Sequence, residues 1–564
     1  MPVRQIQPSR AGTVPWPDEF IARYTERGWW QGRSLGALIQ AAADAPGNPV
    51  RLVDGDLEMT GRELMRRADG AALRLRALGL RPDDRIVLAL PNTWEFVVLT
   101  VACLRLGVLP VMALPAHRRH ELTSVAAMAE ARAIAVPRQS GDVDLGALAR
   151  QITAESDTLE HVLVLGDRAD PEDIDLRALC APAGQPDRAR ADLDAAAPDP
   201  RSVALFLLSG GTTGTPKLIA RTHEDYACMI RLASRICGFG PDTVYLAVLP
   251  LGHGFPMAGP GALGALIAGG RVVLAATPAP DRAFAAIERH RPTVTSLVPA
   301  VVQRWLEHRA ADARHDISSL SLVQVGGSRL PEHLARRIGP ELGCALQQVY
   351  GMGEGLLCLT RLDDPPEVAL HTQGRPVCPD DELLFLGPDG APVPPGVPGV
   401  LLTRGPYTPR GYYRAEELNA AAFSGGWYRT GDVVLRRPDG NLVIEGRDKD
   451  VINRGGEKVF APEVEALAAL IPGLGRVAAV AMPDPELGER VCLYAVPADG
   501  AAPALAAVRS ALERAGLARF KLPDRLILVD ALPSTSVGKV DKQALRADLA
   551  ARPAPSADPR GADR

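Results

Sequence analysis

The chain of 564 residues is predicted to fold as an α/β protein with a large N-terminal part and a small C-terminal α+β domain. Two observations support this prediction. Over roughly the first four-fifths of the chain, short apolar runs alternate with amphipathic stretches of helical period, which is typical of α/β layers with largely parallel sheets. The alternation begins again in about the last hundred residues, after a segment rich in proline and glycine. The length is consistent with roughly three or four compact units.

The first alternating series predicts strands and helices in this order: Arg85–Leu90, helix Trp94–Leu106, Val108–Leu114, helix Glu121–Glu130, Ala133–Val136 and His161–Leu165. One stretch, Phe96–Leu114, is apolar for about the length of a membrane span. A charge at Arg105 and a break at Pro110 instead favour a buried helix that runs into a buried strand.

Residues 182–200 are rich in Ala, Asp, Pro and Arg without an apolar period, and we predict a linker there. A second α/β series extends from Val244 to about Tyr350, and short strands from Glu382 to Tyr413 are expected to form a small β-barrel-like part. The C-terminal elements are predicted at Val477–Met482, Arg490–Val496, helix Ala502–Ala515 and Arg525–Val529. From Ala551 the composition predicts a disordered tail.

Composition argues against several classes of function. Apolar residues make up 46% and charged residues 23%, which is ordinary for a soluble globular protein. A net charge of −4 with interspersed signs argues against nucleic acid as a partner. The eight cysteines have no metal-ligand spacing, so we expect reduced thiols and neither disulfides nor structural zinc. The N-terminus has no apolar h-region, so we expect a cytoplasmic protein without a membrane partner.

The segment Ser209–Lys217 has the composition of a phosphate-binding loop. Its glycines let backbone N–H groups approach a ligand, so that hydroxyls and a lysine can converge on anionic oxygens. It is not a Walker loop, because Pro216 precedes the lysine and no Ser or Thr follows it. A glycine-rich hairpin without a ligand is the alternative. The candidate phosphate contacts are Ser209, Gly210, Gly211, Thr212, Thr213, Gly214 and Lys217.

Four further motifs follow this loop in order: Tyr350-Gly-Met-Gly-Glu354, Thr430-Gly-Asp432, Gly446-Arg-Asp-Lys-Asp450 and Leu532-Pro-Ser-Thr-Ser-Val-Gly-Lys539. Taken singly, each also has an ordinary structural interpretation as a turn carboxylate, a surface ion pair or a solvated lysine. Together they resemble the superfamily of adenylate-forming enzymes, which contains acyl-CoA synthetases, nonribosomal adenylation domains and luciferases. Longer strings, such as Val111-Met-Ala-Leu-Pro-Ala-His-Arg-Arg119, resemble free-standing aryl-acid AMP ligases, such as those for 2,3-dihydroxybenzoate and salicylate.

The resemblance implies that an aromatic acid is activated by ATP to aryl-AMP with release of pyrophosphate. Transfer to the phosphopantetheine of a carrier protein acting in trans would follow, as in nonribosomal peptide, siderophore or antibiotic biosynthesis. Two alternatives stay open: an aryl-CoA ligase that uses free CoA, and a non-catalytic relative retained as a binding protein. ATP and Mg²⁺ are the implied cofactors.

By the same resemblance, each motif has an expected role. The Ser209–Lys217 loop would hold the β- and γ-phosphates, Glu354 would bind Mg²⁺, and Asp432 would accept the ribose hydroxyls beside Arg447. Lys539 is the expected catalytic ammonium, and His253 is a second catalytic candidate. The segments that would surround the rest of the nucleotide contain Gly326, Gly327, Ser328, Tyr350, Gly351 and Met352.

The resemblance also implies two moving parts. We expect an N-terminal adenylation domain at residues 1–448, a mobile C-terminal domain at 449–550 and a disordered tail at 551–564. The hinge would be Lys449. Rotation about it would exchange Lys539 for the segment with Gly455, Gly456 and Lys458, which would face the thiol.

The expected acid pocket departs from its relatives. Ligases for dihydroxybenzoate or salicylate usually carry His-Asn-Tyr followed by Ser, whereas this chain has His253-Gly-Phe255 followed by Gly259. Each lost hydrogen bond costs roughly 1 kcal/mol, and the glycines widen the wall. We therefore expect a bulkier or heteroaromatic acid, such as a hydroxypicolinate, a substituted anthranilate or a quinoline or quinoxaline carboxylate, with plain dihydroxybenzoate or salicylate as the alternative. The predicted pocket residues are His253, Gly254, Phe255, Gly259, Gly327, Gly353 and Leu357.

Overall fold

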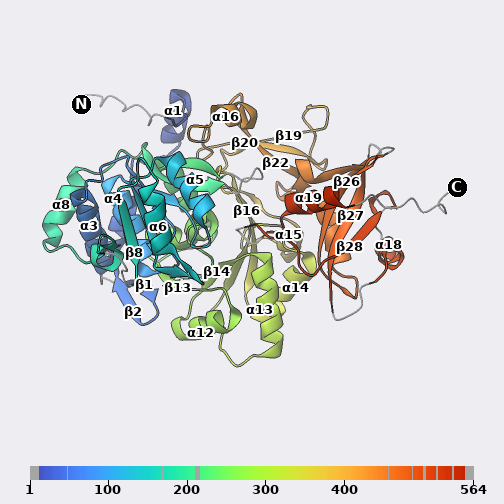
Figure 1. Cartoon of the computed structure of the whole chain (residues 1–564), viewed down its shortest axis with the longest axis horizontal. Coiled ribbons are helices and arrows are strands. Elements are labelled where there is room, and N and C mark those ends of the chain that lie inside the picture. The colour runs from blue at the N-terminus through green and yellow to red at the C-terminus, as the bar shows by residue number, and fades with distance from the viewer. Residues whose placement is uncertain are drawn as a thin grey trace.

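The computed structural model describes residues 12–47, 49–166, 171–209, 216–454, 457–484, 487–498, 503–515, 517, 519–535 and 539–552. In Figure 1 the elements lie along one long axis, from a first α/β layer, through a second, to the C-terminal domain. The predicted α/β class, with a large N-terminal and a small C-terminal domain, is confirmed.

The first layer is a seven-stranded sheet that is parallel except at the β10–β11 edge. Its strands are almost wholly apolar, as expected for a sheet covered on both faces. In spatial order they are β11 (Lys217–Thr222), β10 (Val203–Ser209), β4 (Leu109–Met112), β3 (Arg85–Leu88), β5 (Ala133–Pro137), β8 (His161–Leu165) and β9 (Ile174–Asp175). The helices of this region are α2 (Leu35–Ala43), α3 (Gly61–Ala77), α4 (Trp94–Leu106), α5 (Arg119–Ala129), α6 (Leu145–Ala154) and α7 (Leu176–Leu179), with a small ribbon of β6 (Gln139–Ser140) and β7 (Val143–Asp144).

The second layer is a nine-stranded sheet with a parallel centre and antiparallel edges. Its order is β18 (Arg375–Pro376), β17 (Leu357–Leu359), β16 (Ala345–Gly351), β15 (Leu322–Val325), β14 (Val294–Leu297), β12 (Val244–Ala247), β13 (Arg271–Leu274), β1 (Val50–Asp54) and β2 (Leu57–Thr60). Its helices are α9 (His223–Ile236), α10 (Gly254–Ala258), α11 (Gly261–Ile267), α12 (Pro280–His290), α13 (Pro299–Ala311), α14 (Glu332–Leu342) and α15 (Pro366–His371).

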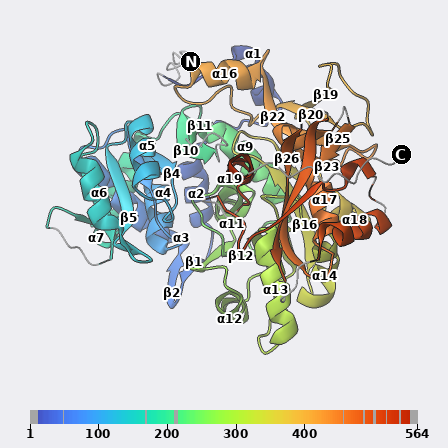
Figure 2. The same cartoon turned by 45° about the vertical axis from the view of Figure 1, so that its right-hand side comes forward.

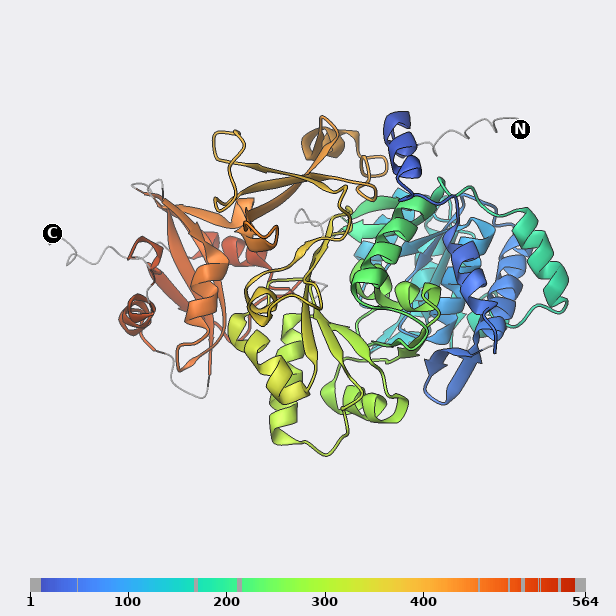
Figure 3. The same cartoon turned by 180° about the vertical axis from the view of Figure 1, so that it is seen from behind.

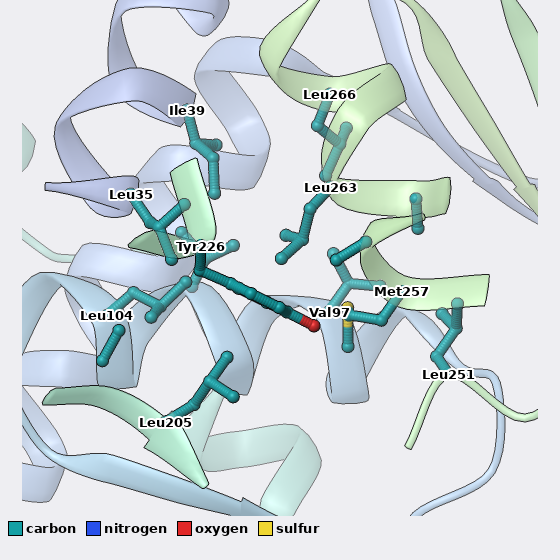
Figure 4. Close-up of a cluster of buried hydrophobic side chains, with 14 of the residues drawn as sticks. Leu35, Ile39, Val97, Leu104, Leu205, Tyr226, Leu251, Met257, Leu263 and Leu266 are labelled. Atoms are coloured by element: carbon teal, nitrogen blue, oxygen red, sulfur yellow. The ribbon is translucent and has the colours of Figure 1, made fainter. Parts of the chain in front are cut away.

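One large apolar cluster joins the two layers. Figure 4 shows part of it around Tyr226 of α9, with side chains from α2, α4, β10, α10 and α11 directed at that ring. Because this core is continuous between the layers, the loops at the strand ends of both sheets are held rigidly against each other.

Two smaller antiparallel units complete the chain. The first contains β19 (Glu382–Leu386), β20 (Gly399–Arg404), β21 (Phe423–Ser424), β22 (Trp427–Arg436) and β23 (Leu442–Arg447), and α1 (Asp18–Glu26) lies beside α16 (Glu416–Ala422) on it in all three whole-chain views (Figures 1, 2 and 3). The C-terminal unit, orange to red, contains β24 (Val451–Arg454), β25 (Glu457–Phe460), β26 (Leu474–Asp484), β27 (Gly488–Pro497), β28 (Arg525–Leu528), α17 (Ala461–Ala468), α18 (Leu505–Arg514) and α19 (Lys542–Ala551).

One sequence prediction is wrong. The expected linker at residues 182–200 contains the helix α8 (Pro186–Ala195), which packs on α3. Ala189 and Leu193, four residues apart, are its buried face, and Pro186 occupies the first turn, where a missing N–H is tolerated. Two apolar contacts were too few to produce a visible helical period.

Other predictions have clear outcomes. The apolar stretch at 96–114 is the buried helix α4 followed by the buried strand β4, as predicted. Within the described part of the chain, no helix combines the length and apolarity needed to cross a bilayer. All eight cysteines are buried and free. The helix α19 extends to Ala551, the first residue of the predicted disordered tail. Residues 553–564 of that tail lie outside the described residues.

Candidate active site

The two large sheets meet at the carboxyl ends of their parallel strands, which is where α/β folds bind ligands. Asn92, just after β3, joins them: its amide donates to the carbonyl of Ala247 (3.1 Å) and its oxygen accepts from the N–H of Leu251 (2.9 Å). Gly252 follows, and a Cβ there would lie 2.4 Å from the carbonyl oxygen of Ala113. The loop that carries the predicted catalytic histidine is therefore fixed against the first sheet.

His253 stands at the start of α10 with an extended backbone. Burial lowers its pKa to about 4, and His117 and Lys539 add positive charge that acts in the same direction. His117, on the loop after β4, is itself buried, and its Nδ1 accepts from the N–H of Leu114 at 3.3 Å. Burial also lowers the pKa of His117. At neutral pH the site therefore contains two uncharged imidazoles, of which only His253 was predicted.

The predicted nucleotide residues on β16, β22 and β23 meet in one hydrogen-bonded group. The Tyr350 hydroxyl donates to Asp432 at 2.6 Å, and Arg447 pairs with the other oxygen of Asp432 at 2.7 Å. Asp432 and Arg447 lie directly opposite each other in the antiparallel pairing of β22 and β23. Burial raises the pKa of Asp432, although Arg447 opposes this, and burial together with Asp432 raises that of Tyr350. The group holds a carboxylate and a guanidinium ready for polar ligand atoms.

Glu354 is held by Tyr412, which lies beside Tyr428, and neither tyrosine was predicted from the sequence. The Tyr412 hydroxyl donates to Glu354 at 2.7 Å, and it lies 3.3 Å from the hydroxyl of Tyr428. Burial raises the pKa of both phenols, and Glu354 adds to the effect. The ammonium of Lys217 lies 4.9 Å from the centre of the Tyr412 ring. The end of the glycine-rich loop and Glu354 therefore meet across one phenol.

The residues present fit a nucleotide and a magnesium ion. The hydroxyl of Ser209 is buried, with no hydrogen-bond partner among the described residues, where a phosphate-binding loop would begin. The described residues contain no group of three or more His, Cys, Asp or Glu side chains suited to a metal. A single carboxylate such as Glu354 is what Mg²⁺ uses when substrate phosphates and water supply its other ligands.

Lys539 enters the site from the C-terminal domain. Its loop is closed by a bond from the N–H of Thr535 to the Lys539 carbonyl at 2.7 Å. Much of the residue's surface is open to solvent, yet the protein around its ammonium lowers the pKa. Arg447 acts in the same direction and Asp432 opposes it. The same charge acts on His253, so the Lys539 ammonium is close enough to influence the pKa of both Asp432 and the histidine.

The predicted acid pocket contains two glycines that face one leucine. A Cβ at Gly254 would lie 3.4 Å from the Cδ1 of Leu207, and a Cβ at Gly353 would lie 3.9 Å from the same atom. A Cβ at Gly353 would also lie 2.7 Å from the end of Ile219, so any side chain there would displace Ile219. The space at Gly353 is therefore already filled by Ile219, whereas Gly254 leaves a methyl-sized space beside Leu207.

The other predicted pocket residues have different surroundings. A Cβ at Gly326 would meet Phe255 at 3.1 Å, so Phe255 covers the glycine-rich end of β15. Gly259 faces the backbone of Phe255 at 3.3 Å rather than Leu207. Gly327 has φ +87°, which favours glycine, and Leu357 is buried in the core against Gly351.

The remaining predicted residues lie outside this polar group or outside the described residues. Ser328 is exposed at the end of β15, and Met352 is partly buried beside the core. Lys449 belongs to the short 3₁₀ turn Asp448–Asp450, and Lys458 belongs to β25. Five loop residues and two of the predicted thiolation glycines lie outside the described residues: Gly210, Gly211, Thr212, Thr213, Gly214, Gly455 and Gly456.

Comparison with known proteins gives consistent results. Residues 39–413 match the family described as AMP-binding enzyme, and residues 463–539 match the AMP-binding enzyme C-terminal domain. The chain is 57% identical to a 2-hydroxy-7-methoxy-5-methyl-1-naphthoate–CoA ligase of Streptomyces carzinostaticus, over 96% of this chain and 97% of that protein. It is 54% identical to a salicylyl-CoA synthase / salicylate adenylyltransferase of a Streptomyces species, over 95% and 98%. The apo structure of Mycobacterium smegmatis MbtA is 42% identical, with a TM-score of 0.72 over 95% of this chain and 98% of that one.

Proposed function

The chain belongs to the AMP-binding enzyme family and is an aryl-acid AMP ligase, and from this premise we propose which acid it uses. It activates a bicyclic or similarly bulky aromatic acid with ATP. It then transfers the acyl group to a phosphopantetheine thiol. The observation that carries the choice of acid is Gly254, which leaves room for a methyl-sized group beside Leu207. A relative that is 57% identical is named for a naphthoate, and its two fused rings would need this extra width.

In the first half-reaction, an oxygen of the acid attacks the α-phosphorus of ATP. A bond forms between that oxygen and phosphorus as the bond to the leaving pyrophosphate breaks. Lys539, whose charge acts on both Asp432 and His253, can pair with the carboxylate and the α-phosphate at once. His253 is neutral, so its ring can border the carboxylate without competing for its charge.

The nucleotide is held from the other side. Asp432 accepts the ribose hydroxyls, because both of its oxygens are oriented by Tyr350 and Arg447. Lys217 and the glycine-rich loop face the β- and γ-phosphates. Glu354, oriented by Tyr412, is the residue that would hold Mg²⁺, which neutralises phosphate charge when bound.

In the second half-reaction, a thiolate attacks the acyl carbon, a thioester forms and AMP leaves. We place the boundary between domains 1–448 and 449–550 at Lys449, with rotation that removes Lys539 and brings the 455–458 segment to the thiol. CoA and a carrier protein present the same phosphopantetheine. Two relatives above 50% identity have CoA in their names, which favours free CoA as a second candidate acceptor beside the carrier protein.

Two assays test the proposal. Acid-dependent ATP–pyrophosphate exchange over salicylate, 2,3-dihydroxybenzoate, 3-hydroxypicolinate, quinoline-2-carboxylate and 2-hydroxy-1-naphthoate should give the largest kcat/KM for a bicyclic acid. A clear preference for dihydroxybenzoate would overturn the choice of acid. Thioester formation with CoA, and separately with a phosphopantetheinylated aryl carrier protein, identifies the acceptor.

A further inference from the structure

A fully buried phenol lies behind the acid pocket without a hydrogen-bond partner. The side chain of Tyr226, on α9, has no exposed surface, and its hydroxyl has no hydrogen-bond partner among the described residues. In Figure 4 the labelled apolar side chains drawn nearest this oxygen are Val97 and Met257, and neither accepts a conventional hydrogen bond from a phenol. An unsatisfied buried hydroxyl is costly, so a partner for it is expected from water, protein or ligand.

This hydroxyl lies beside Gly254, one of the predicted pocket residues. A Cβ built at Gly254 would lie 3.8 Å from the Tyr226 oxygen and 3.4 Å from Leu207. The position that a side chain at residue 254 would occupy is thus bounded by the phenol and the leucine. Both contacts are of ordinary van der Waals length, so the space can hold a methyl-sized group.

The ring cannot easily turn away from this position. The Arg221 guanidinium lies 4.6 Å from the Tyr226 ring centre and forms a buried ion pair with Asp225 at 2.7 Å. The same guanidinium donates to the carbonyl of Gly353 at 3.1 Å. Arg221 therefore ties the phenol to the second glycine of the pocket, so the two sides of the opening are held together.

We propose that Tyr226 is a specificity-determining residue whose hydroxyl donates a hydrogen bond to an acceptor atom on the ring of the acid that is remote from the carboxylate. The inference rests on the proposed bicyclic substrate and adds a requirement to it. The distal ring extends past Gly254, and an ether, hydroxyl or ring-nitrogen acceptor on it satisfies the phenol. Acids that lack such an acceptor leave the phenol unpaired and are selected against.

The test uses Tyr226→Phe and a matched pair of acids, 2-hydroxy-1-naphthoate and its 7-methoxy derivative. In pyrophosphate exchange, wild-type enzyme should prefer the methoxy acid, and Tyr226→Phe should reduce that preference roughly tenfold by lowering kcat/KM for the methoxy acid alone. The Tm of the ligand-free variant should equal or exceed that of wild type, because an unpaired hydroxyl has been removed. The rise in Tm that the methoxy acid causes should shrink.

Tyr245→Phe is the matched control. Tyr245 is also fully buried, but its hydroxyl donates to Ser296 at 3.0 Å, away from the pocket. This variant should lower the ligand-free Tm and leave the preference between the acids unchanged.

Two results would overturn the inference while the proposed function stands. The first is an equal loss of kcat/KM for both naphthoates in Tyr226→Phe. The second is a lower Tm of the ligand-free variant with an unchanged preference between the acids, because this would indicate a buried water as the phenol's partner. A wild-type preference for salicylate over both naphthoates would instead overturn the proposed acid, and this inference with it.

Discussion

The two halves of the site are built on opposite principles. On the nucleotide side, the polar groups Tyr350, Asp432 and Arg447 bind one another, and Tyr412 orients Glu354. On the side proposed for the acid, Gly254 leaves a methyl-sized space beside Leu207, and the hydroxyl of Tyr226 has no hydrogen-bond partner among the described residues. Under the proposed function, ATP would be recognised by groups that already bind one another, whereas the acid would be chosen by the space and the hydrogen-bond donor that it must fill.

The largest effect is expected from removing the charge of Lys539, which acts on both halves of the site. Lys539→Ala should lower kcat for pyrophosphate exchange by roughly 100- to 1,000-fold with little change in Tm, because a charge that stabilises the transition state is lost. Lys542→Ala is the control, since Lys542 pairs with Glu465 at 2.7 Å on α19 instead of entering the site. Near-normal exchange by Lys539→Ala would show that the halves are not joined by this residue.

A smaller effect is expected on the nucleotide side, where polar groups already bind one another. Tyr412→Phe removes the hydrogen bond that orients Glu354, so the Mg²⁺ concentration for half-maximal exchange should rise about tenfold. The neighbouring Tyr413 has a buried hydroxyl without a partner among the described residues, and Tyr413→Phe should leave the Mg²⁺ dependence unchanged. The measurement is exchange rate against free Mg²⁺ at saturating acid, complemented by calorimetric binding of Mg²⁺–ATP. An equal shift in both variants would count against a role for Tyr412.

The role of the space at Gly254 is tested by filling it with a methyl group. Gly254→Ala places a methyl group against Leu207, so kcat/KM for 2-hydroxy-1-naphthoate should fall roughly tenfold while that for salicylate changes less than about threefold. Gly339→Ala, on α14 and remote from the site, is a glycine control whose Cβ would meet only the Cys344 carbonyl at 4.0 Å. Parallel losses for both acids would mean that Gly254 shapes the backbone rather than the width of the pocket.

The smallest effect concerns His253 and pH. Its folded-state pKa of about 4 lies below the ordinary value of 6.5, so the neutral form is favoured by folding. The stability it contributes is present above pH 6.5 and is lost as pH falls through 6.5 toward 4. When the pH is lowered from 7 to 5, the free energy of unfolding measured in urea should fall by up to about 2 kcal/mol less for His253→Gln than for wild type. An identical pH dependence in both proteins would show that the histidine is not desolvated.

Much of the nucleotide side was predictable, because its residues lie in short motifs. Glu354, Asp432, Arg447 and Lys539 were predicted from local strings, and the structure brings Asp432, Arg447 and Lys539 together. Tyr412 was not predicted, because its bond to Glu354 spans 58 residues. His117 and Tyr226 were missed for the same reason. Helix α8 was missed because only two of its side chains are buried.

By itself, the sequence determined the α/β class and the family, and it predicted the residues that would carry charge to the nucleotide, because strand periodicity and short glycine-flanked motifs are properties of neighbouring residues. Only the tertiary structure decided what surrounds the acid. Whether a glycine opens a pocket or merely bends a chain depends on what lies opposite it, and Gly254 and Gly259 differ in this way although five positions separate them in the same segment. Burial likewise favours the neutral form of His253 and leaves the Tyr226 hydroxyl without a hydrogen-bond partner among the described residues, since desolvation arises from segments distant in the chain.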